Sequence, residues 1–180
     1  LYDDPYLLMD PTLEAPFGAV DRFAIALGIS ADDYRRVEAG VLFELQYNLQ
    51  AGHVFLPEDK LIAATAQLLG ISEADIGGGI ERLLQAQHLI RQQLAGITVI
   101  YLWQMHEAEV SCCRRLKEFA RTAYPAPVGL ERKLKKAAAT GNVDYSPAQE
   151  DAIREAATCG MVIITGGPGT GKTTIVNGIL

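Results

Sequence analysis

Apolar residues recur at helical spacing along the first fifty positions, and small residues mark the breaks between the repeats. Residues 21–28 predict one helix, which Gly28 stops. Ser30 stands where it can cap a second helix, and Gly40 ends that helix. Residues 41–49 then predict a third helix. The pattern therefore predicts short helices joined by tight glycine turns.

The period of the pattern changes in the middle of the chain. Residues 57–69 and 72–87 predict two further helices. Gly70 ends the first, and Ser72 caps the second, which glycines 77–79 are expected to interrupt. Residues 88–94 and 97–103 are instead rich in β-branched and aromatic side chains, and they flank Ala95-Gly96, which is typical of a β-hairpin. The order helix, helix, hairpin predicts a winged-helix-like domain.

The remaining pattern predicts four more elements and a linker. A helix over 104–121 carries one apolar stripe, and prolines 125 and 127 mark a boundary. Residues 129–139 predict a basic helix, and Ser146-Pro147 starts another. Residues 161–165 form a continuous apolar run suited to a buried parallel strand. We therefore expect a mainly α chain with a small β component. The stripe on 104–121 consists of Met105, Ala108, Cys112, Leu116 and Phe119.

The composition is that of an ordinary globular protein. The chain has 180 residues, 49% of them hydrophobic, which suits one or two domains with real cores. Its start is acidic and lacks the basic region of a secretory signal, and the uncharged apolar-leaning stretch 92–106 is shorter than the ~20 residues that a membrane helix needs. Three cysteines, two of them adjacent, are a poor disulfide framework. We expect a cytoplasmic protein without membrane contact.

Charge is unevenly distributed along the chain. Residues 1–81 carry 14 acidic and four basic residues, a local net charge of −10. Residues 114–136 carry eight basic and two acidic residues, a local net charge of +6. Nucleic-acid binding depends on neutralising phosphates, which the basic stretch can do and the acidic half resists. For the basic stretch we favour a solvated helix and charged linker, and the acidic half is a candidate surface for protein partners.

Residues 166–173 read Gly-Gly-Pro-Gly-Thr-Gly-Lys-Thr, which fits the phosphate-loop pattern G-x-x-x-x-G-K-[ST]. The glycines let the backbone turn tightly and point its N–H groups at an anion at the start of a helix. Lys172 is placed to hold the β- and γ-phosphates, and the hydroxyl of Thr173 to ligate Mg²⁺. Thr174 is placed near the α-phosphate. The catalytic candidates are thus Lys172 and Thr173, and Thr173 is the candidate metal ligand.

A glutamine precedes the loop by seventeen residues. Gln149 lies on the helix that leads into the predicted strand. Its amide has a donor and an acceptor that can pair with N6 and N7 of adenine. Most surface glutamines have no such role, but the distance before this loop makes Gln149 a candidate adenine contact.

Two stretches of the chain resemble the opening of superfamily 1 helicases. They are Ser-Pro-Ala-Gln-Glu-Asp-Ala-Ile at 146–153 and Val-Ile-Ile-Thr-Gly-Gly-Pro-Gly-Thr-Gly-Lys-Thr-Thr at 162–174. They are most similar to the RecD-like branch, also known as exodeoxyribonuclease V alpha subunit or RecD/TraA helicase, in which the glutamine is the Q motif. Further upstream, residues 4–6 and 17–29 look like the helix-hairpin-helix region of that family, and 36–41 and 52–57 look like its next two signatures.

The resemblance implies an ATP-driven DNA helicase of recombination and repair that moves 5′ to 3′ on single strands, with ATP and Mg²⁺ as cofactors. It implies four segments: a helix-hairpin-helix-like region at 1–50, a winged-helix-like domain at 51–123, a linker with a basic helix at 124–144, and the incomplete start of a RecA-like domain at 145–180. The nucleotide contacts that it implies are Gln149, Gly167, Pro168, Gly169, Thr170, Gly171, Lys172, Thr173 and Thr174.

One part of the chain departs from the family pattern. Helix-hairpin-helix modules hold a DNA phosphate with N–H groups of a Gly-x-Gly hairpin, but this chain has Glu14-Ala-Pro16 there. Proline lacks the N–H group, and Glu14 repels phosphate. We therefore expect a degenerate module that serves for packing or for a partner.

The position of the phosphate loop suggests a segment of a larger protein. The chain begins at Leu1, and the loop lies close to Leu180. Because the water-activating base, the second Mg²⁺ ligand and the arginine finger would come from elsewhere, we expect no ATPase activity of these 180 residues alone. We also expect residues 161–165 to lack a parallel neighbour, and so to be disordered, packed on helices or paired with another copy.

Three functions stay open at this point. A helicase region is the leading interpretation. The second is an adaptor or scaffold that binds a protein partner and contacts DNA little. The third is another P-loop ATPase, such as an AAA+ protein or a kinase.

Overall fold

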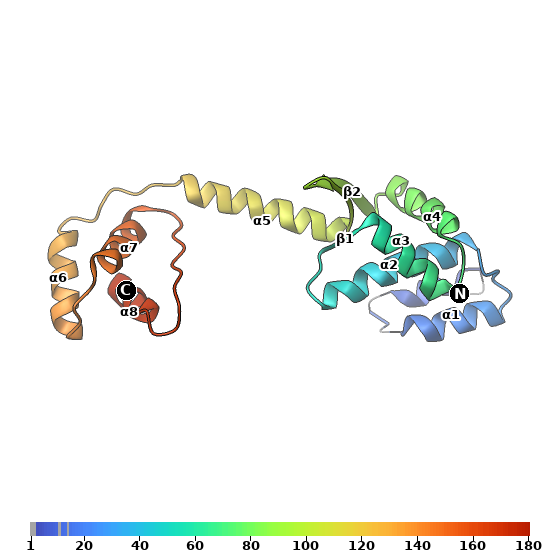
Figure 1. Cartoon of the computed structure of the whole chain (residues 1–180), viewed down its shortest axis with the longest axis horizontal. Helices are drawn as coiled ribbons and strands as arrows, with labels where there is room; N and C mark the ends of the chain where they lie inside the picture. Colours follow the sequence, from blue (N-terminus) through green and yellow to red (C-terminus); the bar gives the residue numbers. More distant parts are fainter. Residues whose placement is uncertain (1–2, 11, 14) are drawn as a thin grey trace. The chain divides into compact units, whose positions relative to one another are not determined.

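The computed structural model describes residues 3–10, 12–13 and 15–180, and it is mainly helical with one small sheet (Figure 1). The expected fold class, mainly α with a small β component, is confirmed. The chain divides into two compact units, residues 1–109 and residues 110–180.

The first unit opens with η1 (Pro5–Met9), α1 (Phe17–Ala26) and α2 (Tyr34–Gln50). Helix α1 begins earlier than the sequence pattern predicts and ends before Gly28, whose φ of +94° stops a helix. Helix α2 is a single element where two helices were predicted.

The expected cap and the expected break in α2 are both wrong. Asp33, not Ser30, caps the helix, because its carboxylate accepts a hydrogen bond from the N–H of Arg35 at 2.9 Å. Gly40 lies inside the helix and does not interrupt it. A Cβ at Gly40 would lie 2.9 Å from Cδ1 of Leu69. The glycine therefore permits close packing of α2 on a neighbouring helix.

Two helices follow, α3 (Glu58–Leu69) and α4 (Glu73–Gln85). Gly70 closes α3 in the left-handed conformation, as predicted. The hydroxyl of Ser72 caps α4, as predicted. The glycines 77–79 do not interrupt α4. At Gly79, as at Gly40, the missing side chain permits close packing of two helices. A Cβ there would lie 2.5 Å from Cγ1 of Val37 on α2.

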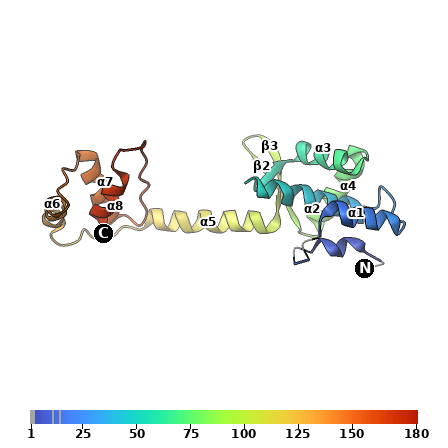
Figure 2. The same cartoon turned by 90° about the horizontal axis from the view of Figure 1, so that it is seen from below.

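The sheet has three antiparallel strands in the order β1-β3-β2. Strands β2 (Leu89–Leu94) and β3 (Ile97–Leu102) confirm the predicted hairpin, and its two turn residues, Ala95 and Gly96, have φ of +50° and +85° (Figure 2). Strand β1 (Phe55–Pro57) was not predicted. Three residues are too few for an alternating pattern, and only the pairing with β3 makes them a strand.

The core of the first unit surrounds a buried ion pair. Arg36 is 5% exposed and pairs with Asp21 through two hydrogen bonds, at 2.8 and 2.9 Å. Its Nη1 donates to the carbonyl oxygens of Ala31 and Leu69 at 2.8 and 3.0 Å. The hydroxyl of Tyr6 donates to Asp21 at 2.7 Å. One guanidinium thus connects α1, α2 and the end of α3.

Helix α5 (Trp103–Arg121) confirms the predicted long helix and runs across the boundary between the two units. None of its residues is buried in the part of the chain that the structure describes. Leu116 and Phe119 of the predicted stripe are 50% and 53% exposed. The stripe is therefore an amphipathic pattern without a covering partner among these residues.

The second unit contains α6 (Leu130–Gly141), α7 (Pro147–Thr158) and α8 (Lys172–Ile179). Their buried contacts are Leu134, Ile153 and Ile175, one from each helix.

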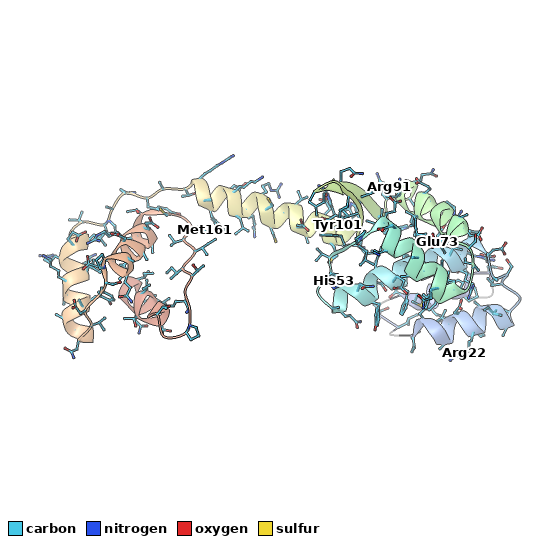
Figure 3. All side chains as sticks on the ribbon, viewed as in Figure 1. Arg22, His53, Glu73, Arg91, Tyr101 and Met161 are labelled. Carbon is cyan, nitrogen blue, oxygen red and sulfur yellow. The ribbon has the colours of Figure 1, made fainter. Side chains whose placement is uncertain are left out.

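The strand predicted at 161–165 does not form, whereas the expectation that the segment lacks a parallel neighbour and packs on helices is confirmed among the described residues. The segment, marked by Met161 in Figure 3, has no strand structure, because no strand lies beside it to complete the hydrogen bonds. Ile164 instead packs against the small core formed by α6, α7 and α8.

Candidate phosphate-binding site

The predicted phosphate contacts lie together in the turn that leads into α8. Gly169 and Gly171 have φ of +76° and +79°, in the left-handed region that favours glycine. Gly171 is the N-cap of α8. A Cβ at Gly171 would lie 2.5 Å from Nε2 of Gln149, so a side chain there would displace the Gln149 amide. Gly167, Pro168, Gly169 and Thr170 form the exposed turn, and Lys172, Thr173 and Thr174 form the first turn of α8.

The ammonium group of Lys172 folds back onto this turn. Its Nζ donates to the carbonyl oxygens of Gly166 and Gly167 at 2.7 and 2.6 Å. The hydroxyl of Thr170 donates to the carbonyl oxygen of Gly167 at 2.9 Å. The positive charge is thereby held beside the first turn of α8, where N–H groups have no partner within the helix. An anion such as phosphate is the ligand that this combination favours.

Gln149 is the predicted contact outside the loop, and the structure brings it to the loop. Its Nε2 donates to the carbonyl oxygen of Thr170 at 3.3 Å. Its Oε1 accepts a hydrogen bond from the N–H of Ser146 at 2.9 Å, and its own N–H donates to the hydroxyl of Ser146 at 3.4 Å. Both ends of the amide are therefore engaged by protein groups. Pairing with adenine requires the amide to exchange these bonds.

Ser146 and Gln149 form a capping box at the start of α7. From the sequence, Ser146 was predicted only as an N-cap. The spacing Ser-x-x-Gln was the signal that could have shown its second role, which is to orient the Gln149 amide.

A cleft of about 350 Å³ lies beside the loop. Its lining includes Gln149 and Glu155 from α7, Ile164 from the segment before the loop, and Lys172 from α8. A cleft of this size fits the lower end of the range for small-molecule sites. A ligand bound at the loop would therefore lie next to a partly apolar cleft.

Arg154 holds the acidic side chains near this site. It donates to Glu131 at 2.8 and 3.1 Å, to Glu150 at 2.8 Å and to Asp151 at 3.0 Å. The hydrogen bond from Arg154 lowers the pKa of the Glu131 carboxyl, and the bonds to Glu131 and Glu150 raise the pKa of Arg154. The pair Arg154–Glu131 ties α7 to α6.

The described residues contain neither a membrane-spanning helix nor a candidate metal cluster. Within 3–10, 12–13 and 15–180, no helix combines the length and apolar character that crossing a bilayer demands. The same ranges hold no cluster of three or more His, Cys, Asp or Glu side chains suited to a metal ion. Cys112, Cys113 and Cys159 are free and exposed.

Comparison with known proteins assigns both ends of the chain. Residues 1–55 match the family described as "ATP-dependent RecD2 DNA helicase HHH domain", and residues 149–180 match the family described as "AAA domain". An ATP-dependent RecD2 DNA helicase of Deinococcus radiodurans is 26% identical over 183 aligned residues. The chain is similar to the N-terminal region of RecD-like helicases. The aligned part covers 91% of the chain and 24% of the length of that relative.

The match to the helix-hairpin-helix family over residues 1–55 covers the place of the expected defect. Glu14 itself lies outside the described residues. Pro16 is the N-cap of α1 and makes no side-chain capping bond.

Proposed function

We propose that these 180 residues form the N-terminal region of an ATP-dependent DNA helicase that acts in recombination or repair and moves 5′ to 3′ on single strands. ATP with Mg²⁺ is the proposed ligand of the turn before α8. The contacts of Gln149 and of residues 167–174 with the nucleotide are part of this proposal. The similarity to RecD2 over 91% of the chain supports the class of enzyme.

The observation that carries the proposal is the direct contact between Gln149 and the phosphate loop. The two motifs are separated in sequence, yet Nε2 of Gln149 lies 3.3 Å from the carbonyl oxygen of Thr170. One nucleotide can therefore reach both, with its phosphates at Lys172 and its base at the start of α7. A phosphate loop alone would support many ATPases, whereas the added glutamine favours the helicase class.

Magnesium would enter this site with the nucleotide. The hydroxyl of Thr173 is exposed at the first turn of α8 and suits a Mg²⁺ ligand beside bound phosphates. The bound ion would neutralise charge on the phosphates. No acidic residue follows Gly166 in the sequence, and phosphate-loop enzymes use such a residue as a further Mg²⁺ ligand. We therefore expect the 180-residue chain to bind ATP without hydrolysing it.

The first unit supports the proposal through its topology. Helix α2, strand β1, helices α3 and α4, and strands β2 and β3 follow one another in the order of a winged helix, with the sheet order β1-β3-β2. We infer a winged-helix-like accessory domain over residues 51–123, to which α2, at the end of the helix-hairpin-helix region, supplies the first helix of the motif. Such domains also serve as scaffolds, so the fold alone does not assign DNA contact to them.

Nucleotide binding by the 180-residue chain tests the proposal. A fluorescent ATP analogue with Mg²⁺ should bind, and Lys172→Ala should weaken binding about 10- to 100-fold, because it removes hydrogen bonds from a charged group. Lys60→Ala is the matched control, since Lys60 is an exposed lysine of the other unit. Equal affinity of the Lys172→Ala and Lys60→Ala variants would refute the nucleotide site, and measurable DNA-stimulated turnover would refute the expected lack of hydrolysis.

A second candidate function is supported by the charge of the first unit. Residues 1–109 carry 16 acidic and six basic residues, a net charge of −10. Such a surface resists a DNA backbone and suits a basic protein partner. An adaptor role for this unit is therefore the alternative. Steeply salt-dependent binding of single-stranded DNA by residues 1–109 would contradict it.

A further inference from the structure

Helix α6 presents an uncompensated basic face. Leu134, which is 4% exposed, anchors the helix in the core of the second unit. At about 100° per residue, the four basic residues of the helix span about 160° and are centred opposite Leu134. All four are exposed, and none forms an ion pair in the described part of the chain. They are Arg132, Lys133, Lys135 and Lys136.

The acidic residue of α6 forms its hydrogen bonds with α7 and not with this face. Glu131 turns to Arg154 of α7, with hydrogen bonds of 2.8 and 3.1 Å. Its charge is thereby matched within the unit, and the charges of the four basic residues remain open to a partner. The same segregation holds on a larger scale, because residues 110–180 carry ten basic and six acidic residues, a net charge of +4, while residues 1–109 carry −10.

We propose that the face of α6 formed by Arg132, Lys133, Lys135 and Lys136 binds the phosphate backbone of single-stranded DNA. This inference rests on the proposed function, which supplies DNA as the substrate. The interaction is with phosphates and not with bases, because exposed lysines act as mobile point charges without a fixed hydrogen-bond pattern. Binding through this face is therefore independent of sequence and weakens with salt.

A membrane surface is the competing polyanion, and the structure disfavours it. Basic helices that lie on membranes insert an apolar face between the lipid headgroups. The apolar face of α6 is already used, since Leu134 packs with Ile153 and Ile175. The helix also packs against α8, which begins at Lys172. The proposed DNA surface is thus carried by a helix that supports the nucleotide site.

The test replaces the four basic residues of α6 by glutamine in the 180-residue chain. Glutamine keeps a high helix propensity, and circular dichroism checks that the fold is retained. The matched control replaces four exposed basic residues of α5 in the same unit, which lowers the net charge by the same amount. Those residues are Arg114, Arg115, Lys117 and Arg121.

Binding of fluorescein-labelled oligothymidylate is measured by anisotropy across a salt series. The α6 variant should lose about tenfold or more in affinity at about 50 mM salt. Its slope of log affinity against log salt should become shallower by up to about 2.8, since each phosphate contact contributes about 0.7. The α5 control should keep most of the wild-type affinity and slope.

Three results would overturn the inference: retained affinity in the α6 variant, equal losses in both variants, or binding of the wild type to vesicles of phosphatidylcholine and phosphatidylserine but not to DNA. Binding of the ATP analogue on the same samples separates this failure from failure of the proposed function. If the α6 variant keeps both DNA and nucleotide while Lys172→Ala loses nucleotide, the inference on α6 is wrong and the nucleotide site stands.

Discussion

The buried pair between Asp21 and Arg36 should dominate the stability of the first unit. In Asp21→Asn the carboxylate that faces Arg36 disappears while the guanidinium stays buried. The side chains of Arg36 and Asp21 are 6% and 14% exposed, so water cannot replace the lost charge. Removing one partner of a buried ion pair costs about 3–5 kcal/mol. This is a large fraction of the stability of a typical domain, about 5–15 kcal/mol.

Urea denaturation followed by circular dichroism measures this cost. With a slope of about 2 kcal/mol per molar urea, the midpoint should fall by about 2 M in Asp21→Asn. Glu81→Gln is the matched control, because Glu81 pairs with Arg91 at 2.6 Å while the two side chains are 55% and 35% exposed. An exposed pair of this kind contributes about 0.2–1 kcal/mol. Equal midpoint shifts in the two variants would refute the argument from burial.

The same pair predicts a dependence on pH. Burial by itself raises the pKa of Asp21, but hydrogen bonds from Arg36 and Tyr6 outweigh burial and lower the pKa below its ordinary value of 3.8. A carboxyl with a lowered folded-state pKa adds stability above its unfolded pKa, and that stability is lost as the pH falls through the folded value. The gap in unfolding free energy between wild type and Asp21→Asn should therefore be constant near neutral pH and shrink below about pH 4. A gap that widens in acid would contradict this sign.

Two further predictions concern packing and capping. Gly79→Ala should destabilise the protein by about 1–3 kcal/mol, because the new Cβ would lie 2.5 Å from Cγ1 of Val37. Gly77→Ala, with no atom within 4 Å of its Cβ, should be neutral or stabilising by up to about 1 kcal/mol through helix propensity. Thermal melts of the two variants check this, and equal shifts in melting temperature would exclude the contact with Val37 as the cause. Ser146→Ala should cost about 1 kcal/mol of unfolding free energy, because its hydroxyl no longer caps α7. Binding of the ATP analogue should stay close to wild type, because the backbone N–H that holds Oε1 of Gln149 is retained in alanine. A large loss of nucleotide affinity in Ser146→Ala would contradict this account of how Gln149 is held.

Glycines show where local reasoning succeeded and where it failed. Gly28 and Gly70 have positive φ and end helices as the sequence pattern predicts. Gly40 and Gly79 look the same in the sequence, but both lie inside helices. Their side-chain positions are filled by Leu69 and Val37 from other helices. The difference is invisible to a local pattern, because it depends on which helices touch.

The amino-acid sequence alone was sufficient to locate the phosphate loop, the partner glutamine, the hairpin and most helix ends. These features depend on neighbouring residues: left-handed glycines, capping side chains and alternating apolar positions act within a few residues of the chain. The candidate phosphate-binding residues 167–174 could be grouped from the sequence for the same reason, since they are consecutive and lie in the turn before α8 and the first turn of that helix.

Tertiary structure decided the features that depend on distant partners. Strand β1 exists because β3 pairs with it, and residues 161–165 form no strand because nothing pairs with them. Arg36 is buried because Asp21, fifteen residues away, neutralises it. Gln149 meets the loop only because α7 and α8 pack around a shared core. Each of these outcomes is a contact between segments, and its free energy appears only when the chain has folded.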